Sequence, residues 1–319
     1  MAAEAVVGVP PGGVARSWAD SVLRLRLKAL RERSLAFWKV FSRSRLGMIG
    51  FIMLLAFLAM ALSAPILTAT GILQDPNAQN LANRFEGPSE RFWFGTDQLG
   101  RDLFSRMWWG SQATLLIGFA ASAISMGLGT VIGLVSGYYG GWVDEILMRI
   151  VDFFLVLPTL VLILVLAIVL PPPGTSLWKV IFVIGISLWA STARLVRAQV
   201  LSLKERQFVE RARAIGTGNT RIVFRHIFPN AFTLVFAEAV LTVAVVILSE
   251  SFLSFINIGP EDAITWGKIL EGALDASALE TGLLYWVLMP GFYIVGIVMA
   301  FTLLGFALDE IVNPRLRKR

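Results

Sequence analysis

Long runs of uncharged, mostly apolar residues alternate with polar segments along the whole chain. Each run can hold a helix of about 20 residues, the length needed to cross about 30 Å of hydrocarbon. The fourth run is short, but Arg194 and Arg197 could snorkel from its end. The pattern predicts an all-α, polytopic membrane protein with six transmembrane helices. The runs are 46–68, 107–143, 153–176, 180–193, 227–248 and 281–308, and the predicted spans are approximately 46–68, 113–136, 153–170, 177–197, 231–254 and 284–307.

The amino-acid composition supports a membrane protein and excludes several kinds of functional site. Of the 319 residues, 56% are hydrophobic and 16% are charged, whereas about 25% are charged in a typical soluble domain. The chain has no cysteine, which excludes a disulfide framework, thiolate metal ligands and a cysteine nucleophile. The first 45 residues are polar and basic, and the first apolar run is too long and too late for a cleavable signal peptide. We expect that run to act as a signal anchor.

Lysines and arginines predict the orientation in the membrane. Most of the 28 lie before residue 46, between 194 and 225, or after residue 308. Because basic residues are enriched in cytoplasmic segments, we expect both termini and the 194–225 loop to be cytoplasmic. The segments 69–111 and 257–280 would then be external, and the second is long enough for a short helix of its own. The net charge of +6 follows from this topology and requires no nucleic acid.

Two domains are predicted, a cytoplasmic N-terminal tail (1–45) and a transmembrane domain (46–319). Residues 17–45 have the pattern of a basic amphipathic helix, which could lie against anionic membrane lipid or simply anchor the first span by its charge. Within the second span, small residues recur every four positions, and we expect that face to pack closely against another helix. These residues are Ala121, Ser125, Gly129, Gly133 and Gly137.

Catalytic and metal-binding patterns are missing from the sequence. It contains no Gly-x-x-x-x-Gly-Lys-Ser/Thr phosphate-binding loop and no His-Glu-x-x-His motif. Its only histidine, His226, cannot build a histidine metal site, and no acid near it in sequence would orient it in a catalytic triad. We therefore predict no catalytic residue, no metal ligand and no enzymatic activity.

Acidic residues inside predicted spans are few. Glu238 interrupts the fifth run, and an acid near the bilayer centre costs about 2.5–3.5 kcal/mol on insertion scales, so it should face protein or water. It could line a translocation pathway and contact a cationic group, or it could bond to a neighbouring helix or a partner chain. Glu250 is a second candidate for the pathway, or an acid satisfied at a helix interface. Asp152 is expected to pair with Arg149 on the same helix.

The polar stretch 204–230 is inserted between two spans. The pattern predicts a helix over 204–215, breaks at Gly216 and Gly218, and a second helix over 221–228 that Thr220 can cap. The outline is similar to a DNA-binding helix-turn-helix, but both ends are tied to membrane spans and neither helix is free to enter a groove. A rigid cytosolic helix joined to spans is instead a docking element for a soluble partner.

The residues of this stretch carry a resemblance to a known family. Glu210-x-Ala212-x-Ala214-x-Gly216, followed by the sequence His-Ile-Phe-Pro-Asn at 226–230, resembles the coupling loop of permease subunits of ATP-binding-cassette importers. The sequence Gly-Thr-Asp at 95–97 with Gly-Arg-Asp at 100–102 is similar to the C-type subunit of the dipeptide/oligopeptide/nickel permeases. The similarity covers roughly residues 40–315. Arg211 stands where that family usually has alanine.

This resemblance implies a type I importer transmembrane domain in a bacterial inner membrane. The chain would form half of a pathway with a second, homologous permease subunit, and an extracytoplasmic substrate-binding protein would deliver peptides, nickel chelates, glutathione or a related solute. Two cytosolic ATPase subunits would bind ATP and Mg, and would contact the coupling loop 198–230. The residues implied in coupling are Glu210, Arg211, Ala212, Arg213, Ala214, Ile215, Gly216, Thr217, His226 and Pro229.

Two other functions remain open from the residues alone. A gradient-driven transporter or channel could use Glu238 as a proton or cation site, and would not need residues 210–216. A membrane-anchored scaffold could bind a cytosolic partner without transport.

Overall fold

The structure is a computed structural model that describes residues 38–171 and 174–312, together with residues 28, 32 and 35. The predicted amphipathic helix of the N-terminal tail lies almost entirely outside these residues, as does the segment 313–319. Within the described part the chain is helical, with one isolated bridge between Thr96 and Asp102 and no named strand. The prediction of an all-α membrane protein is confirmed.

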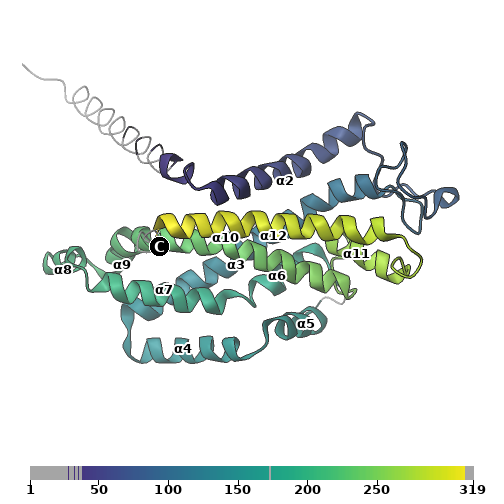
Figure 1. Ribbon diagram of the computed structural model, residues 1–319. Helices are drawn as coiled ribbons and strands as arrows, with labels where there is room; N and C mark the ends of the chain where they lie inside the picture. The colour runs from purple at the N-terminus through teal and green to yellow at the C-terminus, as the bar shows by residue number, and fades with distance from the viewer. Residues whose placement is uncertain (1–27, 29–31, 33–34, 36–37, 172–173, 313–319) are drawn as a thin grey trace, which may run out of the picture.

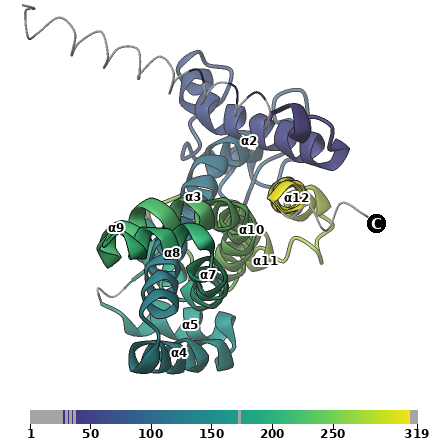
Figure 2. The ribbon, with the colours of Figure 1, turned by 90° about the vertical axis from the view of Figure 1, so that its left-hand side faces the viewer.

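Four helices are long and apolar enough to cross a membrane unaided. They lie side by side along the long axis of the molecule, with α2 on the outside of the bundle (Figures 1 and 2). The helix α10 continues without a large bend from α9 and a π-helical turn, so that Asn219–Phe255 forms one span. These helices are α2 (Arg45–Ala69), α3 (Leu103–Tyr139), α10 (Phe228–Phe255) and α12 (Leu284–Val312).

The third predicted span, 153–170, is wrong as a single straight helix. The chain turns at Gly140 and Gly141, which have φ of +67° and +56°, and α4 (Gly141–Val156) runs back from there. It ends at Val156, two residues before Pro158, and α5 (Thr159–Val169) leaves at 94° to it. Proline cannot donate the next helical hydrogen bond and disfavours helical backbone at the preceding residue, which explains the break.

The fourth predicted span, 177–197, is also divided and is longer than predicted. It consists of α6 (Leu177–Gly185) and α7 (Trp189–Lys204), with a bend of 42° between Ser187 and Trp189. The count of six spans therefore holds when each bent pair counts as one crossing. Because α7 continues to Lys204, it extends seven residues past the predicted end of the span at residue 197.

Three glycines bring α3 into backbone contact with α7. A methyl group added at Gly129 would lie 2.6 Å from the carbonyl oxygen of Trp189, and one at Gly133 would lie 2.6 Å from that of Ala193. At Gly137 the added carbon would meet Val200 Cβ at 2.8 Å. In lipid, such close approach stabilises a helix pair through van der Waals contact. The predicted packing face of small residues is therefore confirmed.

We expect Gly133→Ala to destabilise the folded protein by about 1–3 kcal/mol, because the added methyl group overpacks the α3–α7 contact. Gly127→Ala is the matched control, since Gly127 lies in the same helix with no atom within 4 Å of the added carbon. The control should be neutral or slightly stabilising, because alanine favours a helix over glycine by about 0.5–1 kcal/mol. The measurement is the unfolding midpoint temperature in detergent. Equal midpoints for the two variants would contradict the packing argument.

The external segment before α3 is folded around two buried aspartates. The Asp97 carboxylate accepts hydrogen bonds from the backbone nitrogens of Leu99 and Arg101 at 2.8 and 3.0 Å, and from Arg101 Nε at 2.6 Å. Asp102 caps α3 by accepting from the Ser105 nitrogen at 2.9 Å. At Gly100, with φ +68°, an added carbon would lie 1.8 Å from the Asn80 oxygen, so no other residue fits. The Gly-Thr-Asp and Gly-Arg-Asp motifs are thus structural.

The external loop 257–280 forms the short helix that its length predicted, α11 (Trp266–Asp275). Trp266 is fully buried, and its indole nitrogen donates a hydrogen bond of 2.9 Å to the Met107 carbonyl oxygen of α3. This contact fixes α11 against the N-terminal part of α3.

Candidate functional site

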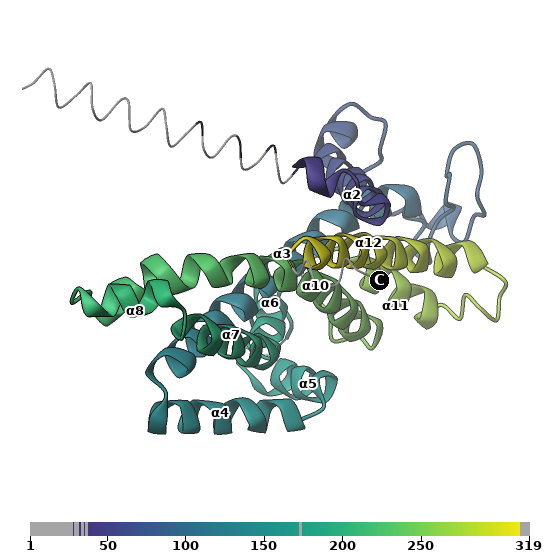
Figure 3. The ribbon, with the colours of Figure 1, turned by 60° about the vertical axis from the view of Figure 1, so that its left-hand side comes forward.

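The polar stretch between α7 and α10 forms a compact unit at one end of the molecule. It contains α8 (Gln207–Ala214), α9 (Asn219–Ile222) and a π-helical turn, Val223–Ile227. In Figures 1 and 3, α8 projects beyond the ends of the long helices. The two predicted helices and the turn between them are present, although the second helix begins at Asn219 with Gly218 at its N-cap, and Thr220 does not cap it.

One face of α8 is buried and the other is free. Val209 and Ala212 have 0% and 5% exposure and pack in a cluster with residues of α3, α7 and the π-helical turn. The remaining predicted coupling residues of this segment face outward, with Thr217 half-buried. The exposed ones are Glu210, Arg211, Arg213, Ala214, Ile215 and Gly216. The buried face therefore makes α8 a rigid projection, and Ile215, 81% exposed, stands at its tip.

The end of α8 is closed by a hydrogen-bonded turn whose backbone conformation favours glycine. The Gly216 nitrogen donates to the Arg213 oxygen at 2.9 Å, and the Thr217 nitrogen donates to the Ala212 oxygen at 3.0 Å. These two bonds satisfy the last helical carbonyls in the Schellman arrangement, with Gly216 at φ +75°. No atom of the chain lies within 4 Å of a carbon added at Gly216. Space around this residue is therefore available to a partner.

The structure separates His226 and Pro229 from that exposed turn. His226 lies in the π-helical turn and is half-buried, and Pro229 lies in the first turn of α10. The His226 carbonyl oxygen accepts a hydrogen bond of 2.6 Å from Asn230 Nδ2. These residues shape the helix that leads back into the membrane rather than the projecting surface.

A basic groove runs along the α7 side of α8. It encloses about 460 Å³ and is lined by Leu203, Arg206, Gln207, Phe208 and Arg211. Phe208 is 39% exposed and lies between the two arginines in sequence. The groove offers positive charge and one aromatic ring beside the exposed turn, and so fits an acidic surface.

Glu250 is fully buried inside the chain. Its carboxylate accepts a hydrogen bond of 2.7 Å from Ser254 Oγ, and the Ser254 hydroxyl in turn lies 3.3 Å from that of Thr265. Glu250 therefore faces the contact between α10 and the external loop, not an open surface. Glu238 is half-buried on α10, on the side that faces Asp309 of α12. Its role in a pathway stays a prediction.

Sequence reasoning missed two ion pairs that join α4 to α7. Asp144 accepts hydrogen bonds from Arg197 Nε and Nη2 at 2.6 and 2.5 Å, and Ser136 Oγ of α3 donates to the same carboxylate. Asp152 pairs with Arg194. The predicted pairing of Asp152 with Arg149 is wrong, because Arg149 lies 4.0 Å from Glu145 instead. The sequence offered one signal for these pairs. An unpaired charge at the membrane is costly, so each of these charged side chains requires a partner on a neighbouring helix.

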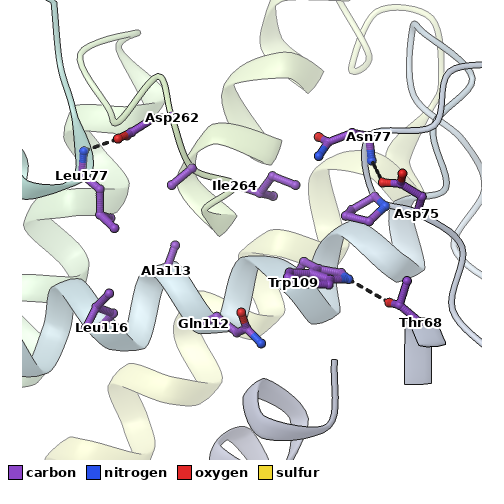
Figure 4. A pocket seen from close by; sticks show the side chains of 12 residues that line it. Thr68, Asp75, Asn77, Trp109, Gln112, Ala113, Leu116, Leu177, Asp262 and Ile264 are labelled. Carbon is purple, nitrogen blue, oxygen red and sulfur yellow. Dashed lines mark hydrogen bonds between the residues drawn. The ribbon is translucent and has the colours of Figure 1, made fainter. Parts of the chain in front are cut away.

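A cavity of about 560 Å³ opens at the other end of the bundle, between the external segment, α3 and the external loop (Figure 4). Trp109 crosses its floor and donates a hydrogen bond of 3.0 Å to Thr68 Oγ1. Asp262 accepts one of 2.7 Å from the Leu177 nitrogen. Among the described residues, no group of three or more His, Cys, Asp or Glu side chains is placed to hold a metal ion.

Comparison with known proteins identifies the class. Residues 129–318 match the family described as binding-protein-dependent transport system inner membrane component, and residues 35–88 match the N-terminal transmembrane domain of oligopeptide transport permease C. The chain belongs to this family of multi-pass inner membrane proteins. It is a permease subunit of an ABC importer and not an enzyme, as predicted. This family membership argues against the two alternatives, a gradient-driven transporter and a membrane-anchored scaffold.

Individual relatives match over nearly the full length. The oligopeptide transport system permease protein OppC of Bacillus subtilis is 34% identical, over 91% of this chain and 93% of that protein. The dipeptide transport system permease protein DppC of Alkalihalophilus pseudofirmus is 34% identical, over 88% and 89%. The glutathione transport system permease protein GsiD of Pectobacterium atrosepticum is 30% identical, over 95% and 99%. Among solved structures, a chain of the MetNI methionine ABC transporter in inward facing conformations matches with a TM-score of 0.49 and 20% identity, over 66% of this chain and 95% of that one.

We expect Gly216→Val to abolish uptake by the assembled importer without preventing membrane insertion. A β-branched residue at φ +75° strains the turn by about 1–2 kcal/mol and adds bulk to the exposed tip. Gly216→Asn is the matched control, because asparagine tolerates this backbone conformation, and it should retain most of the uptake. The measurement is substrate uptake per assembled complex. Normal uptake by Gly216→Val would contradict the assignment of Gly216 to coupling.

Proposed function

We propose that this chain forms half of the translocation pathway of a peptide importer, with di- or oligopeptides as substrates. The observation that carries the substrate class is the similarity to oligopeptide and dipeptide permeases over about nine-tenths of the chain. The glutathione permease relative is consistent with the same class, because glutathione is a short peptide derivative. Selection among peptides lies largely in the binding protein, a separate chain.

The proposed complex contains a second, homologous permease subunit, two cytosolic ATPase subunits and an extracytoplasmic substrate-binding protein. ATP and Mg are bound by the ATPases and not by this chain. The projecting α8 supports a docking role, because its outer face is exposed while its inner face is fixed to three other elements. Because the adjacent groove is lined by two arginines, we expect the ATPase surface that contacts it to be acidic.

The orientation proposed for this complex places both termini and α8 in the cytoplasm. Figure 1 supports it, since α8 lies at the same end of the molecule as the start of α2 and the end of α12. The basic residues of the 194–225 loop are concentrated at that end, as the positive-inside rule requires. The cavity of Figure 4 then opens to the external side.

In the proposed mechanism, ATP binding closes the two ATPases and displaces the α8 turns seated on them. The displacement passes into the membrane because α8 connects directly to α7 on one side and to the span Asn219–Phe255 on the other. The pathway between the two permease chains then opens outward, and hydrolysis resets it. Flexible loops could not transmit such a movement.

The complex should be identifiable by purification from its native membrane. We expect a tagged chain, extracted in mild detergent, to bring with it a second permease chain and ATPase subunits in stoichiometric amounts by mass spectrometry. Reconstituted with its binding protein, the complex should import radiolabelled oligoalanines of two to five residues only when ATP is supplied on the ATPase side. A chain that purifies alone, with uptake that follows an ion gradient and is lost in Glu238→Gln, would contradict the proposal.

The charge of the groove can be tested separately. We expect Arg211→Glu to reduce the amount of ATPase that co-purifies with the permease several-fold, because it places an acid against an acidic surface. The effect should be larger at low salt, where exposed charges are less screened. Arg43→Glu is the control, since Arg43 is exposed in the turn just before α2, outside the coupling segment. Equal ATPase recovery in both variants would exclude an acidic partner surface.

A further inference from the structure

Tyr138 lies at the inner end of α3, where three cytoplasmic elements meet. The side chain is 5% exposed, and its hydroxyl donates a hydrogen bond of 2.8 Å to Oδ1 of Asn219. Asn219 is the first residue of α9 and therefore the first residue of the continuous span that ends at Phe255. The bond ties the inner end of one long helix to the start of another.

Two cations contact the same ring from two further elements. The guanidinium carbon of Arg213, on α8, lies 5.8 Å from the ring centroid, and Lys204 Nζ, at the end of α7, lies 6.0 Å from it. Both distances are within the range of cation–π attraction. The ring of Tyr138 is thus contacted by α7, α8 and, through its hydroxyl, α9.

The helix that carries Tyr138 cannot move independently of α7. Gly137, the preceding residue, meets Val200 of α7 at a separation that excludes even a methyl group, and the contact continues outward through Gly133 and Gly129. A residue fixed to this pair is fixed to the membrane domain. Tyr138 is therefore placed to connect the α8–α9 turn with the α3–α7 pair.

The neighbouring tyrosine has a different environment. Tyr139 is 55% exposed, and its ring meets that of Tyr138 edge to face at 5.4 Å. Among the described residues, no hydrogen bond of the Tyr139 hydroxyl is present, whereas the Tyr138 hydroxyl has a defined acceptor. The two side chains differ in whether the hydroxyl has a hydrogen-bond acceptor, so Tyr139 provides a control one residue away.

We propose that Tyr138 is a positioning residue for coupling: its hydroxyl bond to Asn219 holds the α8–α9 turn rigidly to α3, so that displacement of α8 moves α3. This inference deepens the proposed function and rests on it for the role of α8. Loss of the hydroxyl leaves the ring and its packing in place but releases the start of α9. The complex should then still assemble and hydrolyse ATP, but the displacement of α8 should move α3 by a smaller amount.

The first test measures the distance between the turn and α3 in the purified complex. Since the chain has no cysteine, spin labels can be attached at two introduced cysteines, Ala123→Cys on α3 and Arg221→Cys on α9. Both positions are exposed. We expect one narrow distance distribution by pulsed electron paramagnetic resonance, unchanged when ATP and orthovanadate are added. Tyr138→Phe and Asn219→Leu should broaden the distribution and make it shift with nucleotide.

Two variants distinguish positioning from general stability. Asn219→Asp keeps an oxygen acceptor for the tyrosine hydroxyl and should behave as the unaltered chain, as should Tyr139→Phe. In proteoliposomes, oligoalanine imported per ATP hydrolysed should fall several-fold in Tyr138→Phe and Asn219→Leu and stay unchanged in the two controls. Parallel loss of both activities in all four variants would indicate a merely structural role and overturn the inference.

The outcomes separate this inference from the proposed function. If Tyr138→Phe and Asn219→Leu keep the narrow, nucleotide-independent distribution, Tyr138 does not hold the turn and the inference fails, whatever the complex transports. If the unaltered complex shows no ATP-dependent uptake, the proposed function fails, while the distance measurement still decides whether Tyr138 fixes the turn.

Discussion

Three glycines of α3 meet backbone and β-carbon atoms of α7, and the positions of α4 and α8 depend on that contact. The hydrophobic effect does not drive helices together inside a bilayer, because lipid tails are as apolar as leucine. Close approach of backbones replaces it. Once α3 and α7 are fixed, the paired charges Asp144–Arg197 and Asp152–Arg194 attach α4 to the outside of α7. The same pair supports the buried face of α8 through Val200 and Leu134.

The projecting turn at Gly216 combines two properties that a docking element needs. The buried side chains of Val209 and Ala212 hold the inner face of α8 in place. The tip has unoccupied space around Gly216 and Ile215. The helices on either side enter the membrane without an intervening loop. A contact made at α8 is therefore mechanically continuous with the spans.

Local sequence signals predicted local features well. The uninterrupted run 46–68 coincides with α2, Arg45–Ala69, and the glycines at 216 and 218 placed the turn after α8 correctly. The third span was misplaced because α4 carries charges that are neutralised by arginines on α7, a pairing between residues 53 apart for Asp144 and Arg197. The bond between Tyr138 and Asn219 joins residues 81 apart. Such contacts depend on which helices become neighbours, which hydropathy does not specify.

The length of α3 has a consequence for how far a small movement reaches. With 37 residues the helix extends about 55 Å, well beyond a hydrocarbon layer of about 30 Å. A single helix of this length can therefore extend past the hydrocarbon layer into water. A tilt of only about 5° would displace one end relative to the other by about 5 Å over that length. The leverage depends on the rod staying straight, and so on the absence of proline from Leu103 to Tyr139.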